Sequence, residues 1–252
     1  MAKLDSKGKW LWAKRAGSSD YDAGGGVALD AQGNVFVTGG FASAADFGNT
    51  TLTSKGSRNI FVAKLDSKGK WLWAKRAGSK GYGTGVGIVV STQNDVFVVG
   101  EFNKIADFGS AKLTSQGKHD LFLAKLDKNG KWLWAKRVGS SDYDEGHHIV
   151  IDKQNDIVIT GAFSKTADFG SMKLTSKGKY DLFVAKLDSK GKWLWAKRAG
   201  SSVNDGGFGL AVDTQDNILI TGEFQKTADF ENTKLTSKGY TDVFVWKLKP
   251  NP

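Results

Sequence analysis

Carboxylates two residues apart occur in two loops of the chain and are its clearest candidates for metal chemistry. Asp20 and Asp22 form one pair, and Asp142 and Asp144 form the other. Calcium prefers several oxygen ligands on a flexible loop, and spacing of this kind is a common beginning of such a site. Two other loops of similar sequence have lost or shifted these acids. We therefore expect polar turns without a metal, with Ca²⁺ at these four residues as the lesser alternative.

Two adjacent histidines, His147 and His148, form the second group with metal-binding or proton-transfer chemistry. They stand at the expected entry to a strand, where successive side chains point to opposite faces, so the two rings do not bind one metal ion together. The chain has no cysteine, and no serine is placed by the sequence to use either ring as a base. We interpret the pair as variation within a loop.

The tripeptide Asp-Phe-Gly occurs at 46–48, 107–109 and 168–170. In protein kinases this motif holds magnesium, but only together with a glycine-rich loop, a strand lysine and a catalytic loop. None of these accompanies the motif in this sequence. We interpret the aspartate as a turn cap and the phenylalanine as a core residue, and we predict that the chain is not an enzyme. A metal-dependent enzyme that uses the paired carboxylates is a remote alternative.

All of these residues stand on an internal repeat of 61 residues. Trp10, Trp71, Trp132 and Trp193 show the period, since 10 + 61 = 71 and the same step recurs twice more. A fixed period of this length in a chain rich in β-forming residues indicates a repeat architecture. Each unit contains four short apolar or aromatic runs separated by turn residues, and this pattern predicts four strands.

The predicted fold is an all-β, four-bladed β-propeller of four-stranded antiparallel blades. Runs such as 60–63 are apolar on both faces, so each sheet must be packed on both sides. A closed circle of sheets packed face to face satisfies this requirement. We expect a single domain over residues 1–252, made of an outer closing strand at 8–16 and repeats at 17–77, 78–138, 139–199 and 200–252.

The two ends of the chain predict how the ring closes. Residues 242–248 match the third strand of a unit, and residues 9–15 match the fourth strand. We therefore expect the N-terminal strand to supply the outer strand of the last blade. Residues 2–5 also repeat the end of a third strand, and we expect the C-terminal copy to take this place because it brings the whole strand.

The chain carries a net charge of +10, and its positive charge recurs in every unit rather than in one stripe. Lysine on an exposed edge strand opposes edge-to-edge aggregation, so we expect this charge to serve solvation and expect no nucleic-acid partner. No apolar run is long enough to insert into a bilayer. The N-terminus also lacks the apolar core of a signal peptide. We expect a monomer without cofactors.

The repeat unit resembles the bacterial SBBP-type β-propeller repeat. The resemblance is carried by Asp181-Leu-Phe-Val-Ala-Lys-Leu-Asp, Gly191-Lys-Trp-Leu-Trp and Asn217-Ile-Leu-Ile-Thr-Gly222, and it covers nearly the whole chain in four copies. It implies a secreted or cell-surface bacterial protein, extracellular in its natural context, with no enzymatic activity common to the family. The four copies are unusually alike, which indicates recent amplification or deliberate engineering.

The loops that differ between the repeats point to one face of the ring. Because the strands of a blade alternate in direction, the fourth-to-first and second-to-third loops open on the same face, and variable loops on a rigid scaffold often bind ligands. We predict a non-catalytic binding or adhesion module for a glycan or a protein; the alternative is a structural or engineered scaffold without a ligand. The candidate ligand-binding residues are Asp20, Tyr21, Asp22, Tyr82, Glu101, Asp142, Tyr143, Asp144, His147, His148, Asp205 and Glu223.

Overall fold

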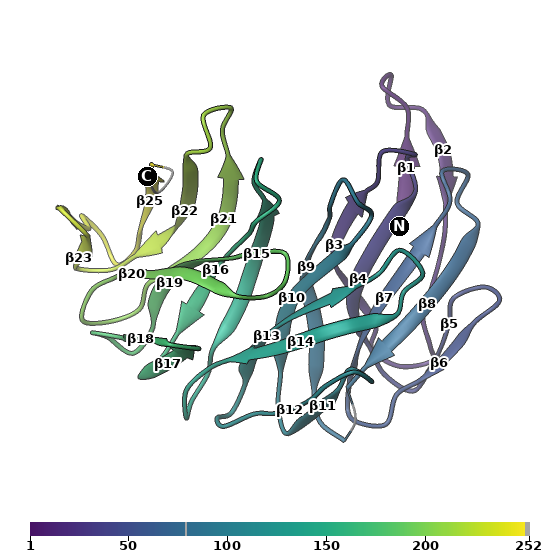
Figure 1. Ribbon diagram of the computed structural model, residues 1–252, viewed down its shortest axis with the longest axis horizontal. Helices are drawn as coiled ribbons and strands as arrows, with labels where there is room; N and C mark the ends of the chain where they lie inside the picture. The colour runs from purple at the N-terminus through teal and green to yellow at the C-terminus, as the bar shows by residue number, and fades with distance from the viewer. Residues whose placement is uncertain (79, 250–252) are drawn as a thin grey trace.

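The computed structural model describes residues 1–78 and 80–249, which form strands joined by turns and loops (Figure 1). Three units each form a four-stranded antiparallel sheet, and the fourth unit forms a three-stranded sheet. The strands of the first two sheets are β3 (Ala23–Leu29), β4 (Val35–Phe41), β7 (Asn59–Leu65) and β8 (Trp71–Ala77), followed by β9 (Gly83–Val90), β10 (Val96–Phe102), β13 (Asp120–Leu126) and β14 (Trp132–Val138). Those of the last two are β15 (Glu145–Ile151), β16 (Ile157–Phe163), β19 (Asp181–Leu187) and β20 (Trp193–Ala199), followed by β21 (Gly206–Val212), β22 (Ile218–Phe224) and β25 (Asp242–Leu248).

The sheets follow one another along an arc, with the innermost strands in contact. β9 packs between β3 and β15, and β15 in turn packs against β21 (Figure 1). This is the arrangement of a propeller of four blades, so the predicted all-β architecture is confirmed. The predicted end of the last repeat, at residue 252, lies outside the described residues.

A small hairpin in each unit delivers the phenylalanine of the Asp-Phe-Gly or Asp-Phe-Glu motif to the core. In the second unit Phe108 is fully buried, and its ring lies 5.2 Å from that of Phe122 and 5.1 Å from that of Trp132. Asp107 caps the turn by accepting a hydrogen bond from the amide of Gly109 at 2.8 Å. The interpretation as cap and core residue is thus confirmed in this unit. The hairpins are β5 (Ala44–Asp46) with β6 (Thr51–Thr53), β11 (Ile105–Asp107) with β12 (Lys112–Thr114), β17 (Thr166–Phe169) with β18 (Met172–Thr175), and β23 (Thr227–Phe230) with β24 (Thr233–Thr236).

The paired tryptophans of each outer strand pack in different places. Trp71 packs on Phe47 in the core of its own unit, whereas Trp73 packs on Phe36 in the core shared with the next unit. Spacing by two residues predicts one shared face. A β-bulge opposite Leu65 breaks this alternation, because an extra residue enters the outer strand there. One tryptophan therefore fills its own blade and the other joins it to the following blade.

The expected closure of the ring needs correction. β2 (Trp10–Ala13) pairs with β1 (Ala2–Leu4), and the sheet of β25 has three strands among the described residues. The N-terminal strand β2 thus does not supply the outer strand of the last blade. Its partner is β1, and not β25 as we expected. A short turn joins β1 to β2, so their pairing requires less loop-closure entropy than pairing with the distant β25.

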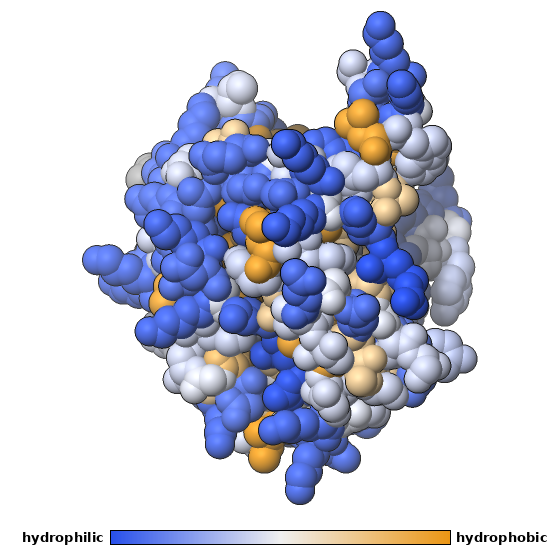
Figure 2. All heavy atoms as spheres, turned by 90° about the vertical axis from the view of Figure 1, so that its right-hand side faces the viewer, coloured by the Kyte–Doolittle hydropathy of each residue, from blue (hydrophilic) through white to orange (hydrophobic). Residues whose placement is uncertain are grey.

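The side of the molecule with β2 and β8 is mainly hydrophilic, with apolar atoms in small separate patches (Figure 2). None of the residues in 1–78 and 80–249 belongs to a helix that could cross a membrane.

Candidate binding face

Three aspartates hold the loops that lead from one unit to the next. Asp144 Oδ2 accepts hydrogen bonds from the amide (2.6 Å) and the hydroxyl (2.9 Å) of Ser140, and Oδ1 accepts one from the amide of Ser164 (3.1 Å). Asp22 and Asp205 make the same three bonds in their own loops. Because a carboxylate makes stronger hydrogen bonds than a neutral acceptor, these residues fix the backbone on which the variable side chains stand.

Backbone hydrogen bonds join each of these loops to the segment before a third strand. The amide of Asp144 donates to the carbonyl of His119 at 2.9 Å, and the next unit repeats this bond. The amide of Gly83 donates in the same way to the carbonyl of Arg58 at 3.0 Å. The two kinds of loop therefore lie side by side on one face, as the strand directions predict.

A row of aromatic and basic side chains runs along this face. The ring of Tyr82 stacks on that of His119, with centroids 5.1 Å apart and planes at 12°, and His119 meets Tyr143 edge-on at 5.1 Å. Arg58 lies 5.9 Å from the centroid of Tyr82, and the Lys118 ammonium lies 5.0 Å from that of Tyr143. The three rings are half-buried, so part of each is available for contact. Ring and cation contacts of this kind hold the row in a fixed orientation.

Two carboxylates lie beside the aromatic row and differ in acid strength. Oε2 of Glu101 lies 3.4 Å from Nδ1 of His119, and Oε2 of Glu145 lies 3.1 Å from Nε2 of His147. Burial raises the pKa of Glu101, and the nearby charge of Glu145 raises it further, against the opposite effect of His119. The hydrogen bond from His147 lowers the pKa of Glu145. The face thus holds a firmly ionised carboxylate and a weaker acid close to each other.

The adjacent histidines have separate partners. Burial disfavours the charged form of His147, but the hydrogen bonds to Glu145 and to the carbonyl of Gly207 outweigh it and raise the pKa of His147. Nδ1 of His148 accepts a hydrogen bond from the amide of Leu210 at 2.9 Å, and burial lowers the pKa of His148. His147 therefore belongs to the candidate binding face, whereas His148 belongs to the contact between two innermost strands.

A cavity of 300 Å³ opens on the same face where the third and fourth units meet. Carboxylate, imidazole, phenol and phenyl groups line it together, from Glu145, His147, Tyr180, Asn204, Phe208 and Glu223. The rings of His147 and Phe208 are 5.0 Å apart. Aromatic surface and acidic groups therefore face one hollow.

The remaining predicted residues stand in the unit-joining loops. Asp20 and Tyr21 are exposed in the first of these loops, and the Tyr21 side chain projects freely at 85 % exposure. Oδ1 of Asp142 lies 3.1 Å from Nζ of Lys118, and this contact lowers the pKa of Asp142. The structure thus gathers part of the predicted set around the aromatic row and the cavity, namely Tyr82, Glu101, Asp142, Tyr143, His147 and Glu223.

The carboxylates considered for calcium already have protein partners. Asp22 and Asp144 accept hydrogen bonds from their own loops, and Asp142 contacts a lysine. Asp20 accepts a hydrogen bond from the amide of Tyr21 at 2.7 Å. Within residues 1–78 and 80–249, no three acidic or histidine side chains are grouped so that they could hold a metal ion. A calcium ion would need to displace these partners to gain the oxygen ligands that it requires.

Several residues of the face were absent from the set predicted from sequence. They stand mainly at two positions of the repeat, before the third strand and at the start of the first strand, and they are Arg58, Lys118, His119, Glu145, Tyr180 and Phe208. The signal was present in the sequence. The position of His119 is arginine, tyrosine or threonine in the other units, so it breaks the period as strongly as the loops that were singled out.

Comparisons with known proteins support the repeat fold. The chain is 26 % identical over 114 residues to an uncharacterised WD repeat-containing protein of Acanthamoeba polyphaga mimivirus, a match that covers 38 % of this chain and 8 % of that protein. It is 24 % identical over 204 residues to the regulatory protein FlaEY of Caulobacter vibrioides, covering 77 % of this chain and 21 % of that protein. The chain therefore spans about a fifth or less of the length of these relatives.

The family itself is not identified by these comparisons. No protein-family model matches the chain, so the SBBP-type resemblance stays a prediction. Among solved structures, the chain is similar to a protein of unknown function from Bacteroides caccae, with a TM-score of 0.49 and 10 % identity over 96 % of this chain and 66 % of that one.

Proposed function

We propose that the chain is a non-catalytic binding or adhesion module of a secreted or cell-surface bacterial protein, and that it binds a glycan or a protein on the loop face. The observation that carries this proposal is the row from Tyr82 through His119 to Tyr143. The residue at the position of His119 differs in every unit, and the tyrosine position becomes asparagine at Asn204, whereas the backbone beneath them is held by the same hydrogen bonds in successive units. Varied side chains on a repeated backbone are what a binding surface requires.

The chemistry of the face favours a ligand with flat apolar surface and hydrogen-bond donors. Half-exposed rings such as Tyr82 and Tyr143 offer an apolar body and a polar hydroxyl. Glu145 adds an ionised acceptor at the wall of the cavity. A sugar ring with its hydroxyl groups fits this combination, and so does a protein segment with basic and aromatic side chains.

The SBBP-type assignment, the extracellular location and the absence of catalysis belong to the same proposal. They draw support from the sequence pattern of the repeat and from the engagement of the paired carboxylates by their own loops. A ligand-free structural or engineered scaffold is the second candidate, because the four units are nearly identical outside the variable positions.

A glycan array and a protein pull-down with the whole chain test the proposal. We expect a defined ligand to bind the wild-type chain and to lose at least tenfold in affinity with Tyr82→Ala/Tyr143→Ala, since buried aromatic anchors often contribute more than about 1 kcal/mol. The matched control is Leu133→Ala, which removes an exposed apolar side chain from β14 and should bind normally. If neither assay finds a ligand, the proposal of a binding module fails and the ligand-free scaffold is favoured.

A further inference from the structure

The last sheet exposes a face that is buried in every other unit. Val243 and Val245 on β25 are 83 % and 72 % exposed. Their counterparts, found by stepping back 61 residues at a time, are fully buried: Ile60, Leu121 and Leu182 for the first, and Val62, Leu123 and Val184 for the second. In those units the side chains pack against the next sheet. The face of β25 is therefore built to receive another unit.

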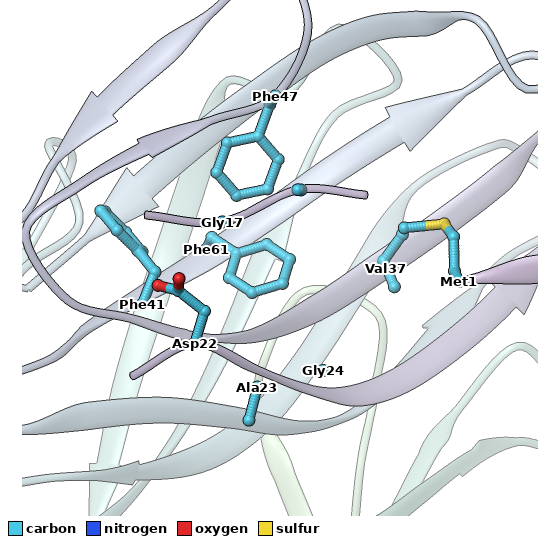
Figure 3. Close-up of a pocket in the computed structure, with 10 residues that line it drawn as sticks. Met1, Gly17, Asp22, Ala23, Gly24, Val37, Phe41, Phe47 and Phe61 are labelled. Carbon is cyan, nitrogen blue, oxygen red and sulfur yellow. The ribbon is translucent and has the colours of Figure 1, made fainter. Parts of the chain in front are cut away.

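The first sheet exposes the complementary face. Val27 on β3 is 66 % exposed, whereas its counterpart Ile88 is 5 % exposed. Beside it lies an apolar cavity of 220 Å³, with Phe41, Phe47 and Phe61 on its walls and Met1 and Val37 across from them (Figure 3). One unit further on, the counterparts of these phenylalanines cluster with Ile60 and Val62, and they are Phe102, Phe108 and Phe122. The cavity is thus the place that a residue like Val243 would fill.

The hairpin of β1 and β2 packs on the first unit in the same way as the third and fourth strands of one unit pack on the next. Nε1 of Trp12 donates to the carbonyl of Ser67 at 3.3 Å, and the indole lies so close to Gly69 that a β-carbon there would collide with it. Trp73 lies against Gly130 in the same way one unit later. The pairing register is also the same as between β7 and β8, with each residue shifted by 61. β2 therefore already stands where the fourth strand of a preceding blade belongs.

An ion pair that is internal to two units is divided between the ends of the array. Arg137 contacts Asp120 at 2.6 Å, and Arg198 contacts Asp181, with both aspartates fully buried. The counterparts of these pairs are Arg15, which is exposed and follows β2, and Asp242, which begins β25. The two sheets lie at opposite ends of the arc (Figure 1).

We propose that β25 of one copy of this chain docks on the first unit of a second copy, displaces β1 and pairs with β2. In the repeated register Trp246 faces Ala13, Lys247 faces Trp12 and Leu248 faces Trp10, as part of a six-pair ladder like that of β7 with β8. Val243 enters the cavity of the second copy, and Asp242 pairs with its Arg15. The interface joins the two ends of the array, so it is head-to-tail and gives a closed ring of copies or a filament. This proposal differs from the monomer that we expect from the sequence.

The mass of the whole chain in solution gives the first test. We expect light scattering and native mass spectrometry to show multiples of the 27.2 kDa chain, with the fraction of assembly rising with protein concentration. A mass of one chain at every concentration up to the solubility limit would overturn the proposal, and it would favour closure of the ring within one molecule.

Charge reversal separates assembly between copies from closure within one copy. Arg15→Asp alone places two aspartates at the contact of residues 15 and 242, and Asp242→Arg alone places two arginines there, whether the contact forms between copies or within one copy. We expect each variant to weaken association about 100-fold. In a mixture of the two variants every junction of an alternating assembly has opposite charges again, so the assembled mass should return. If the singles assemble like the wild type, or if the mixture stays monomeric while both variants show the wild-type circular dichroism spectrum, the proposal fails. Arg76→Asp serves as the control, because Arg76 contacts Asn59 within its own unit and should leave the assembled mass unchanged.

Discussion

The ring of Tyr82 lies nearly parallel to the imidazole of His119, with 5.1 Å between the centroids. Tyr82 comes from the loop between the first and second units, and His119 from the segment that precedes β13. The contact therefore joins the two kinds of variable loop, and its partner Tyr143 extends it to the following unit. Part of the candidate binding face is thus one connected aromatic surface.

The Tyr82–His119 contact should appear as a coupling energy. Removing both rings by Tyr82→Ala and His119→Ala should cost less than the sum of the single changes, by about 0.5–1.5 kcal/mol. Urea unfolding of the four proteins measures this difference. Tyr21→Ala, which removes an exposed ring, should instead add to His119→Ala within about 0.5 kcal/mol. Additivity in both cycles would show that the stacking has no energetic weight.

The pKa values of the two adjacent histidines should be shifted in opposite directions. We expect the pKa of His147 to lie above its usual value near 6.5 and that of His148 to lie below it. Because the pKa of His147 is raised by folding, its contribution to stability is fully present below the unfolded pKa and is lost as the pH rises through the folded pKa. An NMR titration of the imidazole signals measures both values. Glu145→Gln should lower the pKa of His147 and leave His148 as an internal reference; equal shifts of both would contradict the Glu145–His147 contact.

Asp144 should make the protein less stable as the pH rises from about 4 to about 6. Burial raises its pKa from 3.8 to about 6, so the folded state retains a proton that the unfolded state has lost in this window. The resulting loss is at most about 3 kcal/mol, from about 1.4 kcal/mol per pKa unit. Urea unfolding of the wild type and Asp144→Asn across this range checks the sign. The variant should show a flatter pH profile, and parallel profiles would refute the raised pKa.

Calcium should not stabilise the protein. The loop carboxylates Asp22 and Asp144 already accept three hydrogen bonds each from their own loops, and binding of a ligand to the folded state alone would raise the melting temperature. Thermal melts with millimolar calcium and with chelator should therefore coincide. A higher midpoint with calcium that disappears in Asp142→Asn/Asp144→Asn would instead establish a cation site in that loop.

Replacing Lys104 by glycine should stabilise the folded protein. Its φ of 55° lies in the left-handed region, as do those of its counterparts Ser43, Lys165 and Lys226. A side chain costs about 1–2 kcal/mol in that conformation, and glycine gives back part of this through the entropy of the unfolded chain. We expect Lys104→Gly to raise the free energy of unfolding by about 0.5–1 kcal/mol. Lys112→Gly, in the extended β12, should lower it by a similar amount.

The architecture could be predicted because the sequence period and the apolar pattern of the strands both indicate repeated sheets packed face to face. Apolar residues on both faces of runs such as 60–63 require sheets covered on both sides, and those residues are buried in the structure. The side taken by Trp73 could not be predicted, because the bulge in the outer strand leaves no mark in residue types. The closing strand was misplaced for another reason: β1 ends in the same Lys-Leu as β25, so either strand matches the partner of β2 and chain connectivity decides between them.

The candidate binding face was only partly predictable. Tyr82 and Tyr143 were found because their loops vary, whereas His119 was missed because it stands in a segment that reads as the beginning of a strand. The pairing of His119 with Glu101 joins residues 18 positions apart. Such pairs depend on the register between β10 and β13, which sequence spacing alone does not give.

Every pairing within the large sheets joins strands that are neighbours in their own unit, as β4 with β7 and β7 with β8. A sheet can therefore form on the ribosome as soon as its own unit has emerged, without waiting for a distant strand. The newest sheet carries an uncovered apolar face until synthesis of the next unit is complete. Because neighbouring units are nearly interchangeable in sequence, slow translation between them should favour strand exchange between nascent chains on one messenger RNA.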